Sequence, residues 1–244
     1  MSVFKTKLKT AFALGVPNLV RAIGYRVGIK LGLNPLRRLR AAAPRGRFFS
    51  LVPCVSIDLP PVQSWQSSGQ LFGRWKFDLH GSAPDWHCNP LTGGRFDGAH
   101  LDWWKIPDFD AGVGDIKSIW EASRFDWVLA FAQRARVGQV SSVERLDKWL
   151  ADWCEHNPPY KGPNWKCGQE ASIRVMHLAF AALILEQVEV PAPALLSLVQ
   201  LHLQRIEPTL SYAMAQDNNH GTSEAAALYI GGSWLMKQNI PEGN

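Results

Sequence analysis

Residues 168–185 read GQEASIRVMHLAFAALIL, and this stretch decides how the rest of the chain packs. After its first turn, only Arg174 and His177 interrupt a run of small and apolar side chains. A helix that is apolar almost all round is one that its neighbours bury on most sides. The sequence therefore predicts a helix near the centre of the molecule, with other helices packed around it.

Helical periodicity continues on both sides of this stretch, over residues 114–244. One apolar face runs from Ile116 to Phe131, and a second helix is expected from Ser141 to just before residue 157. A further helix begins near Pro193 and has His202 on its apolar stripe, and the last runs from about residue 219 through residue 234. Because short loops join these helices, we expect successive antiparallel hairpins and an all-α fold for residues 114–244.

Residues 44–113 differ from this helical part in composition. They are rich in Pro, Gly, Asp and Trp and show no sustained helical period, although an alternating run at 71–79 predicts a strand. So long a stretch without helix is unusual as a mere connection in a compact domain. We therefore expect a long irregular, partly β wrap around the helices.

Residues 1–43 form a basic N-terminal arm. The first 50 residues hold 11 of the 26 Lys and Arg residues and none of the 21 Asp and Glu residues, so the rest of the chain is acidic. A nucleic-acid-binding domain carries its basic stripe on the folded part, which argues against nucleic acid as a partner. Val20, Ile23, Val27 and Leu31 recur at helical spacing and predict an amphipathic helix.

Two interpretations of this helix stay open. In one, residues 1–40 contact an anionic membrane surface or a partner, and in the other the helix docks on the body with its charges in solvent. Pro17 and Asn18 interrupt the short apolar stretch at 11–20, and basic residues follow at once. This pattern argues against a cleavable signal peptide.

Three polar patches stand out in the helical part. They read DIKSIWEASR at 115–124, NPPYKGPNWKCGQEASIR at 157–174 and NNHGTSE at 218–224. In this order they resemble the toroid domain of the heparinase II/III-like polysaccharide lyases, including related alginate lyases. That domain has a D-I-K-x-x-W-E-x-x-R helix start, an N-P-x-x-x-G-x-N-W loop and an N-N-H turn, and the resemblance covers about residues 72–236.

The resemblance implies an incomplete α/α toroid of antiparallel helical hairpins, which a β-sandwich domain follows in the family. It also implies β-elimination at a uronic acid of an acidic polysaccharide, without a metal or organic cofactor, and a periplasmic location. In that reaction the C5 proton is removed while the adjacent carboxylate is neutralised. Asn219 and His220 match the family's catalytic positions, and the expected substrate-binding residues are Asn164, Trp165, Arg174 and Glu224.

Several of these assignments have a structural alternative. Asn218 and Asn219 suit a helix N-cap in any protein, and Arg174 can pair with Glu170 one turn earlier instead of holding a substrate carboxylate. The family's acid–base tyrosine lies on a later helix, and none of the four tyrosines here matches that position. We therefore expect little or no elimination by this truncated chain. The alternative function is non-catalytic carbohydrate binding or assembly in a surface-polysaccharide pathway.

Overall fold

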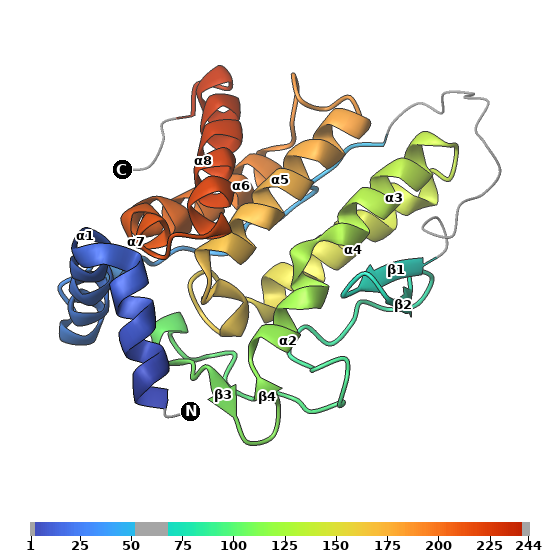
Figure 1. The fold of residues 1–244 in the computed structure, drawn as a ribbon. Helices are drawn as coiled ribbons and strands as arrows, with labels where there is room; N and C mark the ends of the chain where they lie inside the picture. Colours follow the sequence, from blue (N-terminus) through green and yellow to red (C-terminus); the bar gives the residue numbers. More distant parts are fainter. Residues whose placement is uncertain (1–2, 52–67, 241–244) are drawn as a thin grey trace.

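The structure is a computed structural model that describes residues 3–51 and 68–240. Helix accounts for 58% of the chain and strand for 7%, which confirms the predicted, mostly helical class. Three helices lie side by side in one layer, in the order α3 (Asp126–Arg136), α5 (Gly168–Ile184) and α8 (Asn219–Lys237) (Figure 1). Behind them, α4 (Ser141–His156) packs on α3, and α6 (Pro193–Ile206) packs on both α5 and α8.

The middle helix of the front layer, α5, is enclosed on three sides by α3, α6 and α8. Gly231 of α8 permits a close approach, since a Cβ atom there would come within 3.1 Å of Val175 and 2.9 Å of Leu203. The predicted central helix is confirmed. However, it is not buried all round, because the side chains of Phe180 and Leu183 are exposed on its remaining side.

The starts of three helices agree with the sequence-based expectation, at residues 141, 193 and 219. The segment 116–131 does not, because it divides into α2 (Lys117–Trp120), a 3-10 turn (Glu121–Arg124) and α3. Phe125 separates the last two in the left-handed region, at φ 70°, with its buried ring against Trp127 and Trp153. Aromatic packing therefore overrides the helical period here.

The irregular segment is described over residues 44–51 and 68–113. In it β1 (Ser68–Leu71) and β2 (Trp75–Asp78) form an antiparallel hairpin, so the strand predicted at 71–79 is present over β2, and a turn at 72–74 separates β2 from β1. A second pair, β3 (Phe109–Asp110) and β4 (Gly114–Asp115), lies where the segment meets the helices. Asp147 of α4 accepts hydrogen bonds from the backbone N–H groups of residues 48 and 49, which ties the segment to the helical layers.

The N-terminal helix, α1 (Val3–Leu31), is kinked at Gly15, whose φ of 73° lies outside the helical region. It packs against the short helix α7 (Leu210–Ala215). There the ring of Tyr25 stacks on that of Tyr212, with ring centres 4.0 Å apart. Within the described ranges, no helix has the length and apolar character needed to cross a bilayer.

Candidate functional site

A hollow of about 710 Å³ opens where α1, α7 and the beginnings of α5 and α8 meet the turn before α3. Residues from all three motifs line this pocket, although the motifs lie far apart in the sequence. The first motif contributes Asp115, Lys117, Trp120 and Arg124, the second includes Lys166 and Glu170, and the third contributes Asn218, His220 and Glu224. The fold therefore brings the three patches to one place.

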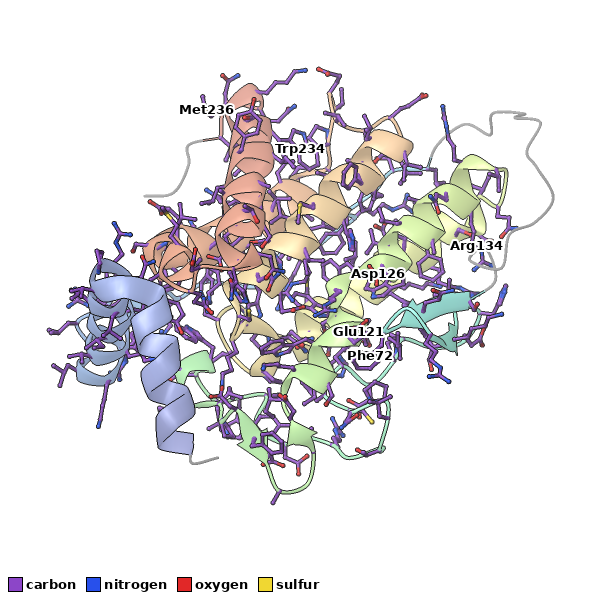
Figure 2. All side chains as sticks on the ribbon, in the orientation of Figure 1. Phe72, Glu121, Asp126, Arg134, Trp234 and Met236 are labelled. Atoms are coloured by element: carbon purple, nitrogen blue, oxygen red, sulfur yellow. The ribbon has the colours of Figure 1, made fainter. Side chains whose placement is uncertain are left out.

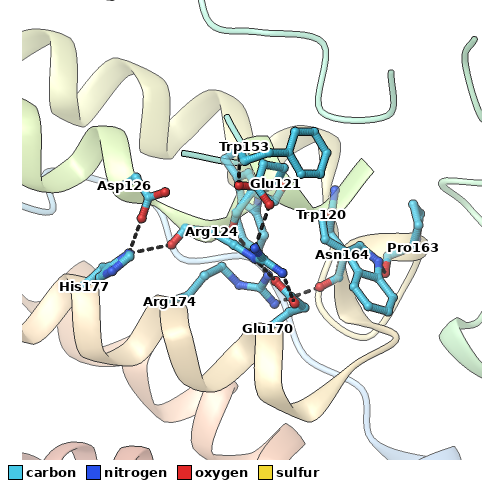
Figure 3. Close-up of polar contacts among 12 residues, drawn as sticks. Trp120, Glu121, Arg124, Asp126, Trp153, Pro163, Asn164, Glu170, Arg174 and His177 are labelled. Carbon is cyan, nitrogen blue, oxygen red and sulfur yellow. Dashed lines mark hydrogen bonds and ion pairs between the residues drawn. The ribbon is translucent and has the colours of Figure 1, made fainter. Parts of the chain in front are cut away.

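Arg124 stands between two carboxylates at one wall of the pocket (Figure 3). Its Nη1 donates to Glu121 Oε2 at 2.6 Å, while Nε and Nη2 donate to the two oxygens of Glu170 at 2.8 and 2.9 Å. This bonding to Glu170 raises the pKa of Arg124. Glu170 thus pairs with Arg124 and not with Arg174. A ligand would meet a guanidinium group whose charge two buried carboxylates already balance.

The beginning of α8 forms another wall. Asn218 caps the helix, because its Oδ1 accepts a hydrogen bond from the backbone N–H of His220 at 3.0 Å. The ring of His220 is partly exposed, and its Nδ1 lies 3.7 Å from Oε1 of Glu224 one turn later. Glu224 is buried against the start of α5, where a Cβ atom on Gly168 would come within 2.7 Å of the same oxygen. The imidazole and the buried carboxylate therefore lie beside each other in the same wall of the pocket.

Asn219 is not one of the residues that line the pocket. The residue is exposed, and its backbone carbonyl accepts hydrogen bonds from the hydroxyl groups of Thr222 and Ser223. Asn218 lines the pocket in its place. Of the two predicted catalytic residues only His220 reaches the pocket, and the capping that we considered for this turn is performed by Asn218.

Three predicted substrate-binding residues, Asn164, Trp165 and Arg174, have no exposed surface. Arg174 donates from Nε to Nε2 of His202 and from Nη2 to the carbonyl oxygen of Asn164, both at 2.8 Å. The Trp165 ring packs on His202 with ring centres 4.7 Å apart. Burial lowers the pKa of Arg174 to about 10. As their side chains lie, these residues have no surface for the predicted substrate contacts, because Arg174 joins α5 to α6 and to the loop before α5, while Asn164 and Trp165 bond to Asn157.

Two arginines in the pocket wall were not among the site residues predicted from the sequence. They are Arg26 of α1 and Arg205 near the end of α6. Arg205 is buried, and its Nε and Nη2 donate to the carbonyl oxygens of Trp165 and Lys166 at 2.8 and 2.6 Å. Among the residues that the structure describes, its Nη1 has no hydrogen-bond partner and neither arginine forms an ion pair, although the guanidinium of Arg205 lies 4.2 Å from the ring centre of Trp103. The sequence does contain a pattern that could have identified Arg205, because it follows His202 by three residues on an otherwise apolar stripe.

Two tyrosines also line the pocket, although none was expected there. Tyr25 and Tyr212 reach it as the stacked pair that joins α1 to α7. Burial raises the pKa of Tyr25 to about 12. Its phenol therefore stays protonated at neutral pH, where it is a hydrogen-bond donor and not a base.

The charges of the pocket wall indicate the kind of ligand it suits. Lys166 contacts Asp108 at 2.5 Å and Arg124 is bound to Glu170, so these cations are compensated. Arg26 and Arg205 are not, and the N-terminus of α8 adds a partial positive charge. A carboxylate or sulfate group satisfies such cations. No cluster of three or more metal-ligating side chains occurs in residues 3–51 and 68–240.

The sequence matches no protein-family model, and searches of curated proteins and of solved structures gave no significant match. The similarity to the heparinase II/III-like lyases thus depends on the three motifs. A helical fold by itself hosts many functions, so the residues of the pocket, and not the fold, indicate what the protein binds.

Proposed function

We propose that the pocket binds a uronate-containing acidic polysaccharide, and that the chain is the N-terminal toroid portion of a protein like the heparinase II/III lyases. The observation that carries this proposal is the convergence of all three motifs on one pocket. Helix caps and structural ion pairs need no open hollow beside them, whereas a ligand site does. The shared location therefore favours a ligand-binding purpose for the polar residues that line it.

The two layers of helices support the toroid part of this proposal. In an α/α toroid, consecutive hairpins place one helix in an inner layer and the next in an outer layer. Here α3, α5 and α8 follow one another in one layer, while α4 and α6 return the chain through the other. We infer that the α3, α5 and α8 layer is the inner wall of an incomplete toroid, with the pocket at one end.

The pocket wall suits an acidic sugar in both charge and shape. A uronate presents a carboxylate, which Arg26, Lys117 and Arg205 can attract, and hydroxyl groups, which the side-chain amide of Asn218 can bind. Sugar rings also have apolar faces, and Trp120 supplies an aromatic surface in the same wall. A neutral glycan would offer Arg26 and Arg205 no negatively charged partner.

The chemistry available in the pocket is incomplete for elimination. The reaction needs a base for the C5 proton and a group that stabilises the charge developing on the carboxylate. Neutral His220 can accept a proton, and the N-terminus of α8 can stabilise negative charge. The tyrosine used by the family has no counterpart, and the protonated phenol of Tyr25 is no base. Binding with little or no turnover is therefore the expected behaviour.

Calorimetric titration with uronate oligosaccharides and with neutral oligosaccharides of equal length tests the binding proposal. The native chain is expected to bind only the acidic sugars. Lys117→Gln is expected to weaken this binding roughly tenfold, or about 1.4 kcal/mol. Lys237→Gln is the matched control, because Lys237 is also an exposed lysine beside a carboxylate, at the opposite end of α8. Equal affinity for both sugars, or equal affinity of Lys117→Gln and the native chain, contradicts the proposal.

Ultraviolet absorbance of unsaturated uronate separates binding from catalysis. Binding without new absorbance is the expected result, and it agrees both with an inactive lyase portion and with the alternative function, a non-catalytic carbohydrate-binding protein of a surface-polysaccharide pathway. New absorbance that is lost in His220→Gln identifies a working lyase and contradicts the expectation of an inactive chain. Absorbance that is unchanged in His220→Gln removes His220 from the mechanism.

A further inference from the structure

The outer face of α1 carries an apolar stripe that no described residue covers. Val16, Val20, Ile23, Val27 and Leu31 are 74, 64, 52, 47 and 65% exposed. They follow one another at steps of three and four residues, so they form one stripe along the helix. Figure 2 shows side chains of α1 that project away from the rest of the protein. Contiguous exposed apolar patches mark interaction surfaces.

The opposite face of the same helix is the one that docks on the protein. Tyr25 stacks on Tyr212, and Ile29 packs against the main hydrophobic core. The helix therefore has two apolar stripes, of which only one is used for attachment to the body. The outer stripe is left for a partner outside the described chain.

The charge around the stripe identifies the chemistry of that partner. Arg21 and Lys30 are exposed on the same helix, and Arg38 is exposed just beyond it. The first 50 residues hold 11 basic residues and no acidic one. An aliphatic stripe flanked only by cations fits the surface of an anionic bilayer, where apolar side chains enter between headgroups and cations bind the phosphates. A second copy of the chain is disfavoured, because it would bring two basic arms together.

We propose that α1 binds the surface of an anionic membrane through this outer stripe, with its axis in the plane of the interface. The docked side of the helix supplies Tyr25 and Arg26 to the pocket wall. A membrane-bound α1 would therefore hold the pocket close to the bilayer surface. This proposal is independent of the ligand that the pocket binds.

Co-sedimentation of the full chain with vesicles tests the proposal. Vesicles of phosphatidylcholine alone are compared with vesicles that also contain phosphatidylglycerol, and binding is expected only to the second kind. The variant Val20→Gln/Ile23→Gln/Val27→Gln is expected to bind at least about tenfold more weakly, while keeping the native circular dichroism, because these side chains are exposed. The matched control, Phe180→Gln/Leu183→Gln/Tyr229→Gln, changes three exposed apolar residues away from α1 and is expected to bind like the native chain.

The other outcomes overturn the proposal in distinguishable ways. No binding to either vesicle, or equal binding to both, removes the anionic membrane as partner. Equal binding of the stripe variant and the native chain removes the stripe as the contact. A native dimer that the stripe variant dissociates, seen by sedimentation equilibrium without vesicles, identifies the stripe as a contact between copies of the chain instead. Removing positive charge in Arg21→Gln/Lys30→Gln/Arg38→Gln is expected to weaken vesicle binding and to reduce its dependence on salt, although eight of the eleven basic residues of the first 50 remain.

Discussion

Two polar regions of this molecule are built from overlapping motifs but differ in their access to solvent. In one, Arg174, His202 and Asn164 bond to one another between helices, without exposed surface. In the other, His220 and Lys117 line a hollow of about 710 Å³. A polar residue in such a motif can therefore have either of two roles, to hold helices together or to contact a ligand. The side of the helix on which the residue lies decides between these two roles.

The largest expected effect on stability is in the enclosed region. Arg174→Met keeps most of the side-chain volume but leaves the carbonyl oxygen of Asn164 and the Nε2 of His202 without their donor. We expect the free energy of unfolding in urea to fall by about 3 kcal/mol, because buried polar groups lose their partners. A variant that stays as stable as the native chain, but no longer binds an acidic sugar, would show that Arg174 contacts the ligand. The proposed difference between the enclosed region and the pocket would then be wrong.

A smaller effect is expected where the two regions meet, at Glu170. Glu170→Gln removes the charge that binds both Nε and Nη2 of Arg124, and we expect the free energy of unfolding to fall by about 2 kcal/mol. Glu189→Gln is the control, because Glu189 pairs with Lys237 on the surface, where the loss should stay below about 0.5 kcal/mol. Equal losses in the two variants would show that the Arg124 cluster is no more than a surface ion pair.

The enclosed region is also expected to make stability depend on pH. Burial and the nearby Arg174 hold the pKa of His202 well below its ordinary value of 6.5. The unfolded chain then binds a proton that the folded chain does not. The free energy of unfolding should therefore fall as pH drops below about 6.5, by up to about 1.4 kcal/mol per pH unit for this residue.

Urea unfolding from neutral pH to about pH 5 measures this slope. In His202→Gln the dependence of the free energy of unfolding on pH should be weaker, by the contribution of the one proton that His202 binds on unfolding. Some slope should persist through His87, whose pKa burial also lowers. An identical slope in His202→Gln and the native chain would contradict the lowered pKa, because it would mean that His202 binds its proton equally in the folded and the unfolded chain.

Helix positions could be predicted because their signals are local. The start at Pro193 follows from a proline that suits the first helical turn, and the apolar run at 168–185 is continuous in the sequence. The break at Phe125 could not be predicted, because its left-handed conformation accompanies ring contacts with Trp127 and Trp153. Tertiary packing of this kind does not change the helical periodicity of apolar residues in the sequence, so that periodicity cannot reveal it.

The candidate site was predictable to a similar extent. His220 and Glu224 lie one turn apart at the start of a helix, so their proximity follows from the sequence alone. Arg174 could not be assigned, because only its neighbours decide whether a lone arginine in an apolar helix meets solvent. Tyr25 and Arg205 reach the pocket from elements far from the motifs, and no local pattern brings them together.

The smallest effect on stability, and the largest on binding, is expected at His220, and this pair of measurements tests the central claim most directly. For His220→Ala we expect the free energy of unfolding to stay within about 0.5 kcal/mol of the native value, since the ring is partly exposed. The affinity for a uronate oligosaccharide should fall about tenfold or more, while Tyr229→Ala, an exposed change elsewhere on α8, leaves it unchanged. Native affinity in a stably folded His220→Ala variant would contradict the assignment of this pocket as the acidic-sugar site.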